Sequence, residues 1–386
     1  MAISLADDHV RWLRQRAQRL ILPQHDSITT VAQVVKDLCG IQAQDAFAAS
    51  LAVRVRSTGL SNEHVEHARL QERSVIRTWG QRGTLHLLAT KDLDWLLPLF
   101  SPFFIAANQR RYAELGLDEH TLARGLRAIR SVLANQGPLT RDELTEQLAV
   151  QGIRLIGQAR PYLVQRAALE GLICFGPDRG AKPTYALLSD WLGQQRKQRQ
   201  GQPLSQASAH AELARRYLTA YGPATPEDLA AWSSLPISKT RTAWQDISNQ
   251  LIEVEIAGSP AWMLKTYKAW LDEPFVDAPP VVRLLPGFDT YLLGYKKRDL
   301  LVPPQHAKRI NAGGGMLNPV LLVNGLAMGT WKSKRQKHRL DVMLEPFEQL
   351  APELQPWLQA EVEDLGRFLR VQTTLQVIPP ILTKNT

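Results

Sequence analysis

The stretch Gly137–Leu144, GPLTRDEL, returns further along the chain as Gly222–Leu229, GPATPEDL, so the pattern G-P-x-T-x-acid-acid-L occurs twice. In each copy a threonine, Thr140 or Thr225, is placed to cap a helix N-terminus through its side-chain oxygen. The two acids that follow would lie in the first turn, where the positive end of the helix favours negative charge. The repeat therefore predicts two helices that begin by the same chemistry.

The same order of predicted elements surrounds both copies. An amphipathic helical run precedes each copy, a second helical pattern follows it, and two strand-like segments close the unit. The helical runs are Leu122–Leu133 and Leu213–Tyr221, then Arg160–Glu170 and Lys239–Gln250; the strands are Leu172–Phe175 with Tyr185–Leu188, and Leu251–Ile256 with Trp262–Leu264. Three helices followed by a hairpin is the order of a winged helix, a relative of the helix-turn-helix.

The N-terminal region fits this order less cleanly. Helical periodicity covers Val10–Leu20, Thr30–Leu38 and Asp45–Arg56, with Thr29 or Thr30 and then Asp45 as the expected caps. Strand-like segments follow at Val75–Trp79 and Thr84–Leu88, joined by Gly80–Gly83, and Lys91–Leu117 is expected to form a helical connector. The sequence thus predicts a third winged helix at the start of the chain.

After Pro279 the pattern changes to strands. Strands are predicted at Val281–Leu285, Tyr291–Tyr295, Val320–Val323, Leu326–Trp331 and Leu340–Leu344, a helix at Glu353–Leu369 and a last strand at Gln372–Val377. Asn324-Gly325 is a strong signal for a type I′ hairpin turn. We therefore expect an α+β protein with three tandem winged-helix (helix-turn-helix) units, at 1–117, 118–195 and 205–270, and a β-rich C-terminal domain at 279–386.

Composition limits the class of protein. The chain has 386 residues, of which 44% are hydrophobic, and 46 Lys and Arg against 37 Asp and Glu give a formal charge of +9. This predicts a globular, multidomain protein with a polyanionic partner. Cys39 and Cys174 lie in segments expected to be buried, and neither they nor any motif indicates a metal or cofactor site. We expect no signal peptide, because acids precede any apolar run at the N-terminus, and no membrane span at Leu93–Ala107, which is too short and too interrupted. We expect a soluble, cytoplasmic monomer.

Basic residues alternate with aromatic ones in several places, which is typical of a DNA-binding surface. The candidate DNA-binding residues are Arg77, Arg82, His86, Lys296, Lys297, Arg298, Lys332, Lys334, Arg335 and Lys337. Such a run is often only a solvated face, and a winged helix can also bind proteins, but the net charge favours DNA. An isolated histidine such as His86 is more often a hydrogen-bonded structural residue than an acid or base catalyst. Asp289 is expected to form a turn.

Two neutral amides, Gln42 and Gln44, lie between the second and third predicted helices. If the backbone from Gly40 to Gln44 is extended, these side chains point the same way, because side chains alternate along a strand. They would suit a site that holds a water molecule by hydrogen bonds. Taken alone, the Q-x-Q pattern arises often by chance, and a polar loop is the simpler interpretation.

Several motifs together resemble one family, over nearly the whole chain. They are Gln42-Ala43-Gln44, Arg77-Thr78-Trp79 with Arg82–His86, Leu285–Asp289 and Gly325–Trp331. This combination looks like the AlkZ-like winged-helix DNA glycosylases, whose members unhook interstrand crosslinks and remove N7-alkylguanines. The resemblance implies three tandem winged helices and a C-terminal β-barrel-like domain around a DNA-binding channel. It also implies that Gln42 and Gln44 are the catalytic pair, because Gln42-Ala43-Gln44 matches the family's catalytic signature position by position. A sister branch carries aspartate at the third place of this signature. Gln44 stands there in this chain, and Asp45 lies one place too late to be that aspartate, so the chain looks like a member of the Q-x-Q branch.

Neutral amides fit the chemistry that the resemblance implies. Alkylation at N7 makes guanine cationic, so the base leaves without a general acid, and the remaining task is to position a water molecule. We therefore expect a DNA glycosylase without a cofactor that hydrolyses the N-glycosidic bond of cationic N7-alkylguanine in damaged double-stranded DNA, including crosslinked DNA. Two alternatives remain open: a non-catalytic winged-helix transcription regulator, and an interaction scaffold without DNA affinity.

Overall fold

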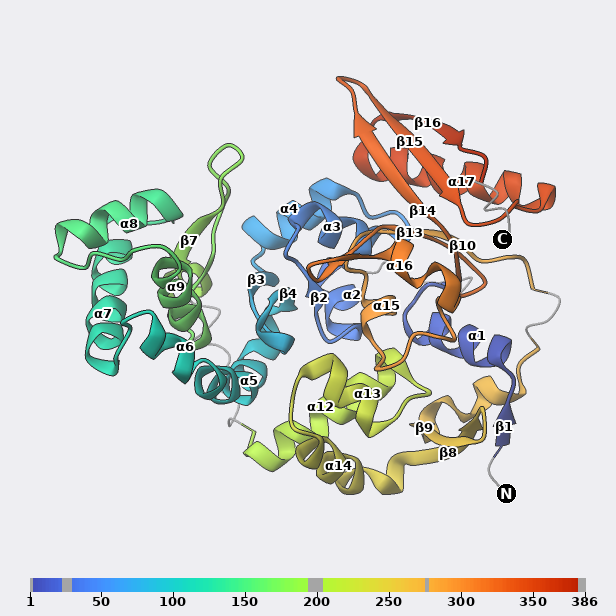
Figure 1. The fold of residues 1–386 in the computed structure, drawn as a ribbon, viewed down its shortest axis with the longest axis horizontal. Coiled ribbons are helices and arrows are strands. Elements are labelled where there is room, and N and C mark those ends of the chain that lie inside the picture. Colours follow the sequence, from blue (N-terminus) through green and yellow to red (C-terminus); the bar gives the residue numbers. More distant parts are fainter. Residues whose placement is uncertain (1–2, 23–29, 194–203, 275–277, 381–386) are drawn as a thin grey trace. The chain divides into compact units, whose positions relative to one another are not determined.

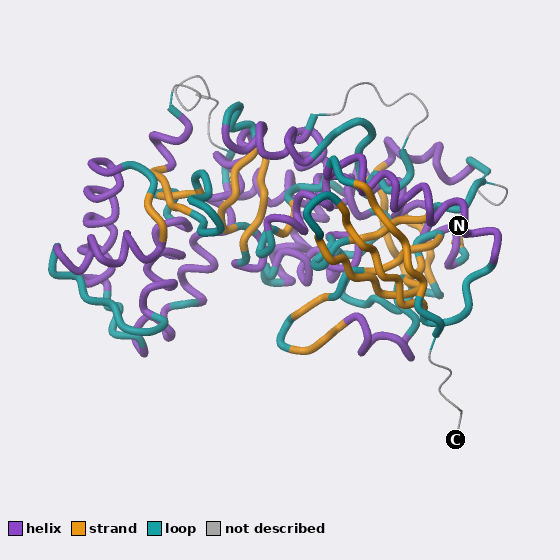
Figure 2. The backbone as a smooth tube through the Cα atoms, turned by 90° about the horizontal axis from the view of Figure 1, so that it is seen from above, coloured by secondary structure: helices purple, strands orange, loops and turns teal. Residues whose placement is uncertain are grey.

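The computed structural model describes residues 3–22, 30–193, 204–274 and 278–380, and combines many helices with several small sheets (Figures 1 and 2). The chain divides into two compact units. Residues up to Val65 and those from His210 onward form the first, here called unit 1, and Glu66–Ala209 form the second, called unit 2. The predicted α+β class is confirmed.

The helices of unit 1 come from both ends of the chain. They are α1 (Asp7–Ala17), α2 (Val31–Asp37), α3 (Ala46–Arg54), α13 (Pro226–Ser233), α14 (Ile237–Asp246), α15 (Thr290–Leu293), α16 (Ala307–Ile310) and α17 (Gln355–Leu369). Two further helices cross the boundary between the units along the chain, α4 (Asn62–Leu70) and α12 (Gln206–Tyr221). On α17 the apolar side chains of Leu358, Val362 and Leu365 are buried, and this amphipathic stripe packs the helix against the C-terminal sheet.

The largest sheet of unit 1 lies in the C-terminal region, where it curls into a half-barrel. Its strands, in sheet order, are β10 (Val282–Leu285), β13 (Val320–Val323), β14 (Leu326–Arg335), β15 (Arg339–Pro346) and β16 (Gln372–Val377). All neighbours are antiparallel except β15 and β16, which run parallel. Asn324 and Gly325, between β13 and β14, both have positive φ, as the predicted type I′ turn requires.

Smaller strands complete unit 1. They are β1 (Ile3–Leu5), β2 (Ile41–Gln42), β8 (Leu251–Ile256), β9 (Ser259–Leu264), β11 (Asn311–Gly313) and β12 (Met316–Leu317). The β8–β9 hairpin is the one predicted after the second G-P-x-T copy, and β1 adds to its edge in parallel. Neither β1 nor the β11–β12 hairpin was anticipated from the sequence.

Unit 2 is mostly helical. Its helices are α5 (Leu93–Ala107), α6 (Gln109–Glu114), α7 (Glu119–Gln136), α8 (Arg141–Val150), α9 (Ala159–Leu169) and α10 (Leu188–Leu192); its strands are β3 (Val75–Trp79), β4 (Leu85–Ala89), β5 (Leu139–Thr140), β6 (Ile173–Phe175) and β7 (Thr184–Leu187). Apolar faces of α7, α8 and α9 form one core with β6 and β7. The helical structure predicted for Lys91–Leu117 is confirmed as α5 and α6.

The two repeat copies begin helices as predicted. Thr140 accepts a hydrogen bond from the backbone N–H of Glu143, and the Glu143 carboxylate accepts one from the N–H of Thr140. Thr225 and Asp228 make the same reciprocal pair at the start of α13. Each pair satisfies two N–H groups that a helix N-terminus otherwise leaves without partners.

One predicted strand is wrong. The sequence predicts a strand at Tyr291–Tyr295, but Thr290–Leu293 is the short helix α15. Asp289 caps this helix by accepting a hydrogen bond from the N–H of Tyr291 at 2.9 Å. The local cap therefore outweighs β propensity.

The described ranges contain neither a membrane-spanning helix nor a cluster of metal-binding side chains. No helix there is long and apolar enough to cross a membrane. Nor do those same residues bring together three or more His, Cys, Asp or Glu side chains in a way that could hold a metal ion.

Candidate active site

The Q-x-Q segment follows a tight helix end. After α2, Cys39 adopts a positive φ of 54°, its N–H donates to the carbonyl of Lys36, and the N–H of Gly40 donates to the carbonyl of Val35 at 2.9 Å. This pair of bonds is the Schellman arrangement, in which glycine usually takes the left-handed position. Here Cys39 occupies that position and is buried, as predicted for this cysteine. The turn directs the chain out of α2 and into β2.

Side chains of α12 hold the same helix end. Arg216 donates to the carbonyl of Lys36 at 3.3 Å, and the Tyr221 hydroxyl donates to the carbonyl of Leu38 at 3.3 Å. Burial raises the pKa of Tyr221 to about 12, so its hydroxyl stays protonated as a donor. The backbone that leads into the motif is therefore fixed from a second direction.

The two glutamines differ in exposure. Gln42, at the end of β2, is 7% exposed and Ala43 is 1% exposed, whereas Gln44 is exposed. The strand ends at Gln42 and the chain bends at Gln44, so the extended backbone assumed for a common direction covers only part of the motif. One amide is thus enclosed by protein and the other faces solvent.

Asp45 caps α3 directly after the motif, as predicted. Its carboxylate accepts hydrogen bonds from the backbone N–H of Phe47 at 2.8 Å and of Ala48 at 3.2 Å. Thr30 likewise caps α2 by accepting from the N–H of Gln33. Gln44 therefore sits one residue before a capped helix, and its backbone position is set by the start of α3.

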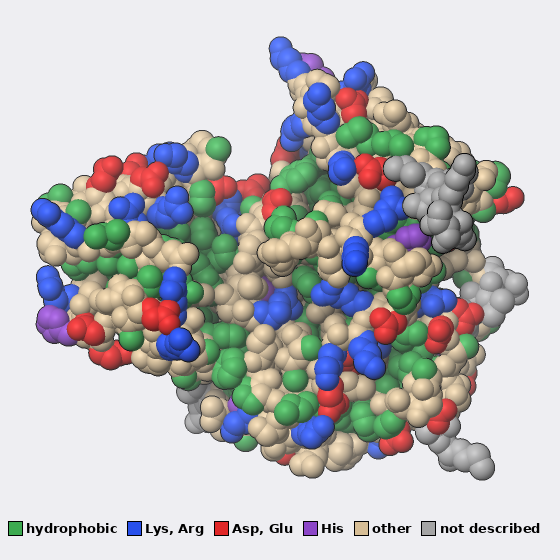
Figure 3. All heavy atoms as spheres, in the orientation of Figure 1, with side chains coloured by type: hydrophobic (Ala, Val, Ile, Leu, Met, Phe, Trp, Pro, Cys, Tyr) green, Lys and Arg blue, Asp and Glu red, His purple; other side chains and the backbone are tan. Residues whose placement is uncertain are grey.

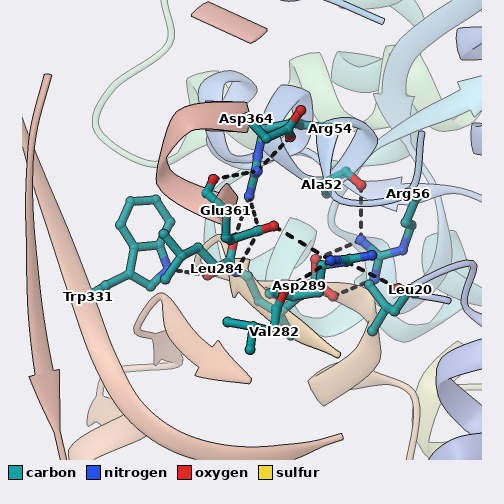
Figure 4. A network of polar contacts seen from close by, with 12 residues as sticks. Leu20, Ala52, Arg54, Arg56, Val282, Leu284, Asp289, Trp331, Glu361 and Asp364 are labelled. Carbon is teal, nitrogen blue, oxygen red and sulfur yellow. Dashed lines mark hydrogen bonds and ion pairs between the residues drawn. The ribbon is translucent and has the colours of Figure 1, made fainter. Parts of the chain in front are cut away.

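The far end of α3 is held by a buried ion pair (Figure 4). The Arg56 guanidinium donates to both carboxylate oxygens of Asp289, at 2.8 and 2.6 Å, and both side chains are fully buried. It also donates to Gln18, Ala52 and Thr290. Asp289 forms the predicted turn, but this partner was not foreseen.

A second arginine links α3 to the C-terminal sheet and helix. Arg54 donates to Glu361 at 2.7 Å, to Asp364 at 2.9 Å and to the carbonyl of Leu284 (Figure 4). Burial alone would lower the pKa of Arg54, but the two carboxylates outweigh burial and raise it above its ordinary value. A signal was present in the sequence: Arg54 and Arg56 end an alanine-rich apolar helix, where charged groups need buried partners.

Three candidate DNA-binding residues follow α15. Lys296 and Lys297 are exposed, and the N–H of Lys296 donates to the Asp228 carboxylate at 2.9 Å. Arg298 is half-buried and donates to the Asn311 side chain at 3.0 Å; burial lowers its pKa from the ordinary value. This basic segment is therefore tied to the start of α13.

The β14–β15 hairpin carries four more candidates. Lys332, Lys334, Arg335 and Lys337 are all exposed, and basic side chains gather at the tip of this long hairpin (Figure 3). Lys332 pairs with Glu345 at 3.0 Å, whereas the other three form no ion pair with any residue that the structure describes. The sequence predicts that this basic segment follows a hairpin, whereas in the structure it forms the tip of the β14–β15 hairpin itself.

In unit 2, Arg77, Arg82 and His86 lie on and between β3 and β4. Arg77 is buried with its guanidinium 4.5 Å from the ring centre of Phe175, while Arg82 is half-exposed with a φ of 57°. His86 is 1% exposed and its Nδ1–H donates to the carbonyl of Thr84 at 3.0 Å. Burial, together with the charge of Arg82, lowers the pKa of His86 to about 3, so the imidazole is neutral near pH 7.

The chain is similar to known proteins over most of its length. Residues 35–368 match the family model described as DNA glycosylase AlkZ-like. The interstrand DNA cross-link repair glycosylase of Streptomyces sahachiroi is 29% identical over 329 residues, which cover 82% of this chain and 85% of that protein. The solved structure of Streptomyces sahachiroi DNA glycosylase AlkZ matches with a TM-score of 0.80 at 26% identity, over 97% of this chain and 100% of that one.

Proposed function

Because this chain belongs to the AlkZ-like DNA glycosylase family, we propose that it removes cationic N7-alkylguanine from damaged double-stranded DNA, with a water molecule positioned by Gln42 and Gln44. The relative from Streptomyces sahachiroi is named for interstrand cross-link repair, so unhooking of such crosslinks is part of the proposal. The observation that carries it is the unequal exposure of the two amides at the capped start of α3.

The proposed roles follow from this geometry. Gln44 faces solvent, so its amide is the one that meets the attacking water. Gln42 is enclosed, and its amide orients the water or the Gln44 side chain. Since a glutamine carbonyl accepts hydrogen bonds and its NH2 donates them, the pair can position a water molecule without titrating near neutral pH.

The reaction balances without a protein acid or base. The water oxygen forms a bond to the anomeric carbon of the deoxyribose as the bond from that carbon to N9 breaks. The bonding electrons pass to the purine, which leaves as neutral N7-alkylguanine, and the water loses its proton to solvent. The products are the free base and an abasic site.

The exposed cations are the proposed DNA contacts. Lys296 and Lys297, with Lys334, Arg335 and Lys337 on the β14–β15 hairpin, are available to phosphates, and Lys332 and Arg298 lie beside them along the chain. For unit 2 we propose that Arg82 is the contact and that buried Arg77 and His86 hold the segment that carries it. His86 packs against Gly80, where an added Cβ would lie 3.3 Å from its ring.

We also propose that the three helix-rich segments are tandem winged helices. In both repeat copies the order of helices and strands matches this arrangement: α7, α8 and α9 precede β6 and β7, and α12, α13 and α14 precede β8 and β9. At the start of the chain, α1, α2 and α3 precede β3 and β4 with α4 as an added helix.

The test is release of N7-methylguanine from a duplex, followed by alkaline cleavage of the abasic site. Gln42→Ala and Gln44→Ala should each abolish release while duplex affinity changes little, because neither substitution removes charge. Gln71→Ala, at another exposed glutamine, is the matched control and should retain wild-type release. Wild-type rates in both motif variants would show that the motif is assigned wrongly, and binding without any release by the wild type would favour a non-catalytic DNA-binding protein.

A further inference from the structure

An arginine stripe runs along the exposed side of α7 in unit 2. Arg124, Arg127 and Arg130 are all exposed, and their spacing of three residues places neighbours on the same side of the helix, about 4.5 Å apart along its axis. The sequence from His120 to Gln136 contains no acid. Within the part of the chain that the structure describes, none of the three guanidinium groups forms a hydrogen bond or an ion pair.

Three other exposed cations of unit 2 are paired with acids. Arg179 pairs with Glu143, Lys182 with Asp142 at 3.2 Å, and Arg110 with Glu114 at 3.0 Å. The first two belong to the loop between β6 and β7, which is the wing of the proposed winged helix, and their charge is offset by acids in the first turn of α8. The wing is therefore not the most cationic surface of unit 2.

The helix that would read the DNA major groove is also covered. In a winged helix this is the helix before the wing, here α9, and it needs an open face to enter the groove. On α9 only Arg160 and Pro161, in its first turn, are exposed. Its Gln165 donates to the carbonyl of Gly83 at 3.2 Å, and its Tyr162 ring lies 6.1 Å from that of Tyr112 on α6.

We propose that the exposed face of α7 that carries Arg124, Arg127 and Arg130 binds the phosphate backbone of double-stranded DNA. A row of guanidinium groups at helical spacing suits phosphate oxygens, which accept hydrogen bonds from guanidinium in pairs. Unit 2 then contacts duplex through a helix that reads no sequence, as a lesion-directed enzyme requires. The inference rests on the DNA-binding part of the proposed function, not on the roles of the glutamines.

The test measures salt dependence of binding to an undamaged duplex by the full chain. Each phosphate contact contributes about 0.9 to the slope of log affinity against log salt concentration. The triple variant R124A/R127A/R130A should therefore lower the magnitude of that slope by up to about 2.7 and should weaken binding at low salt at least tenfold. The variant should fold normally, since alanine is the best helix former at exposed positions. A triple Arg→Lys variant should keep most of the slope, because it retains the charges.

The matched control removes the same number of charges from paired positions. R110A/R179A/K182A changes the net charge by the same amount, yet its slope should stay close to that of the wild type because these cations already have acid partners. Equal slope changes in both triple variants would overturn the proposal, as would an unchanged slope in the α7 variant. An α7 variant that keeps duplex binding but loses binding to phosphatidylserine vesicles would also overturn it and assign the surface to anionic membranes.

This result is separable from the failure of the proposed chemistry. If the R124A/R127A/R130A variant kept the wild-type salt slope while the wild type released base, only the proposed DNA-binding role of α7 would be refuted. If the R124A/R127A/R130A variant lowered the salt slope as expected but the wild type released no base, only the glycosylase assignment would be refuted.

Discussion

Arg56 and Asp289 form a bidentate ion pair whose two hydrogen bonds are 2.8 and 2.6 Å long and whose side chains are both fully buried. The pair joins the end of α3, which starts beside the Q-x-Q motif, to the cap of α15. Asp289→Asn removes one charge and keeps the shape, so it leaves Arg56 as an uncompensated buried cation. We expect a loss of about 3–5 kcal/mol in the free energy of unfolding, measured by chemical denaturation.

Asp364 provides the comparison for that prediction. It also accepts a hydrogen bond from an arginine, at 2.9 Å from Arg54, but its side chain is 35% exposed. Asp364→Asn should therefore cost about 1 kcal/mol or less, because the lost carboxylate is partly solvated and Glu361 still pairs with the buried Arg54 guanidinium. A similar loss in both variants would mean that burial does not set the strength of the Asp289 pair.

The cap of α3 provides a second prediction. Asp45→Ala removes the acceptor for the N–H groups of Phe47 and Ala48, and the loss of such a cap costs about 1 kcal/mol. Because Gln44 precedes this cap, the rate of base release should fall more than stability alone explains. Asp45→Ser, which restores a capping oxygen without the charge, should recover the rate. Recovery of stability without recovery of the rate would show that the carboxylate itself matters.

Elements whose cause is local could be predicted from the sequence, and contacts between distant segments could not. Thr140, Thr225 and Asp45 cap helices because a cap depends on the next three residues, and these assignments were confirmed. Arg56 and Asp289 are 233 positions apart, so nothing in either segment names the other. The sequence identifies Gln42 and Gln44 as a pair, but it does not predict that one is buried and the other exposed. Exposure depends on which distant segments pack over the turn.

His86 predicts a pH dependence of stability. Its pKa is lowered to about 3 in the folded protein by burial, and then by Arg82, from an ordinary value of 6.5. Protonation therefore favours the unfolded chain, and the stabilisation is fully present above about pH 6.5 and is lost as pH falls toward 3. Between pH 6.5 and 5 the wild type should lose about 2 kcal/mol more than His86→Asn, which keeps an N–H donor but cannot titrate. Parallel stability curves for the two proteins, measured by urea unfolding, would contradict this.

Gln44→Glu tests why the motif is neutral. Neither wild-type glutamine titrates, so the rate of N7-methylguanine release should be flat between about pH 5 and 6.5. In this range ordinary carboxylates are ionised and the lesion still keeps its N1 proton and its positive charge. The wild type should not release an uncharged lesion such as 8-oxoguanine at a measurable rate, because a neutral base is a poorer leaving group than a cationic one. A carboxylate at Gln44 would stabilise the developing sugar cation. The Gln44→Glu variant should therefore release 8-oxoguanine at a measurable rate.

The comparison variant for this prediction is Gln71→Glu. It adds the same charge at an exposed glutamine outside the motif, so any gain that comes from net charge alone would appear in both variants. The gain should be confined to Gln44→Glu, because the field of a carboxylate acts strongly only within a few ångströms of the sugar. If the wild type itself released 8-oxoguanine, or if its rate on N7-methylguanine followed a bell-shaped pH profile, a titrating acid or base would be at work and two neutral amides would not suffice.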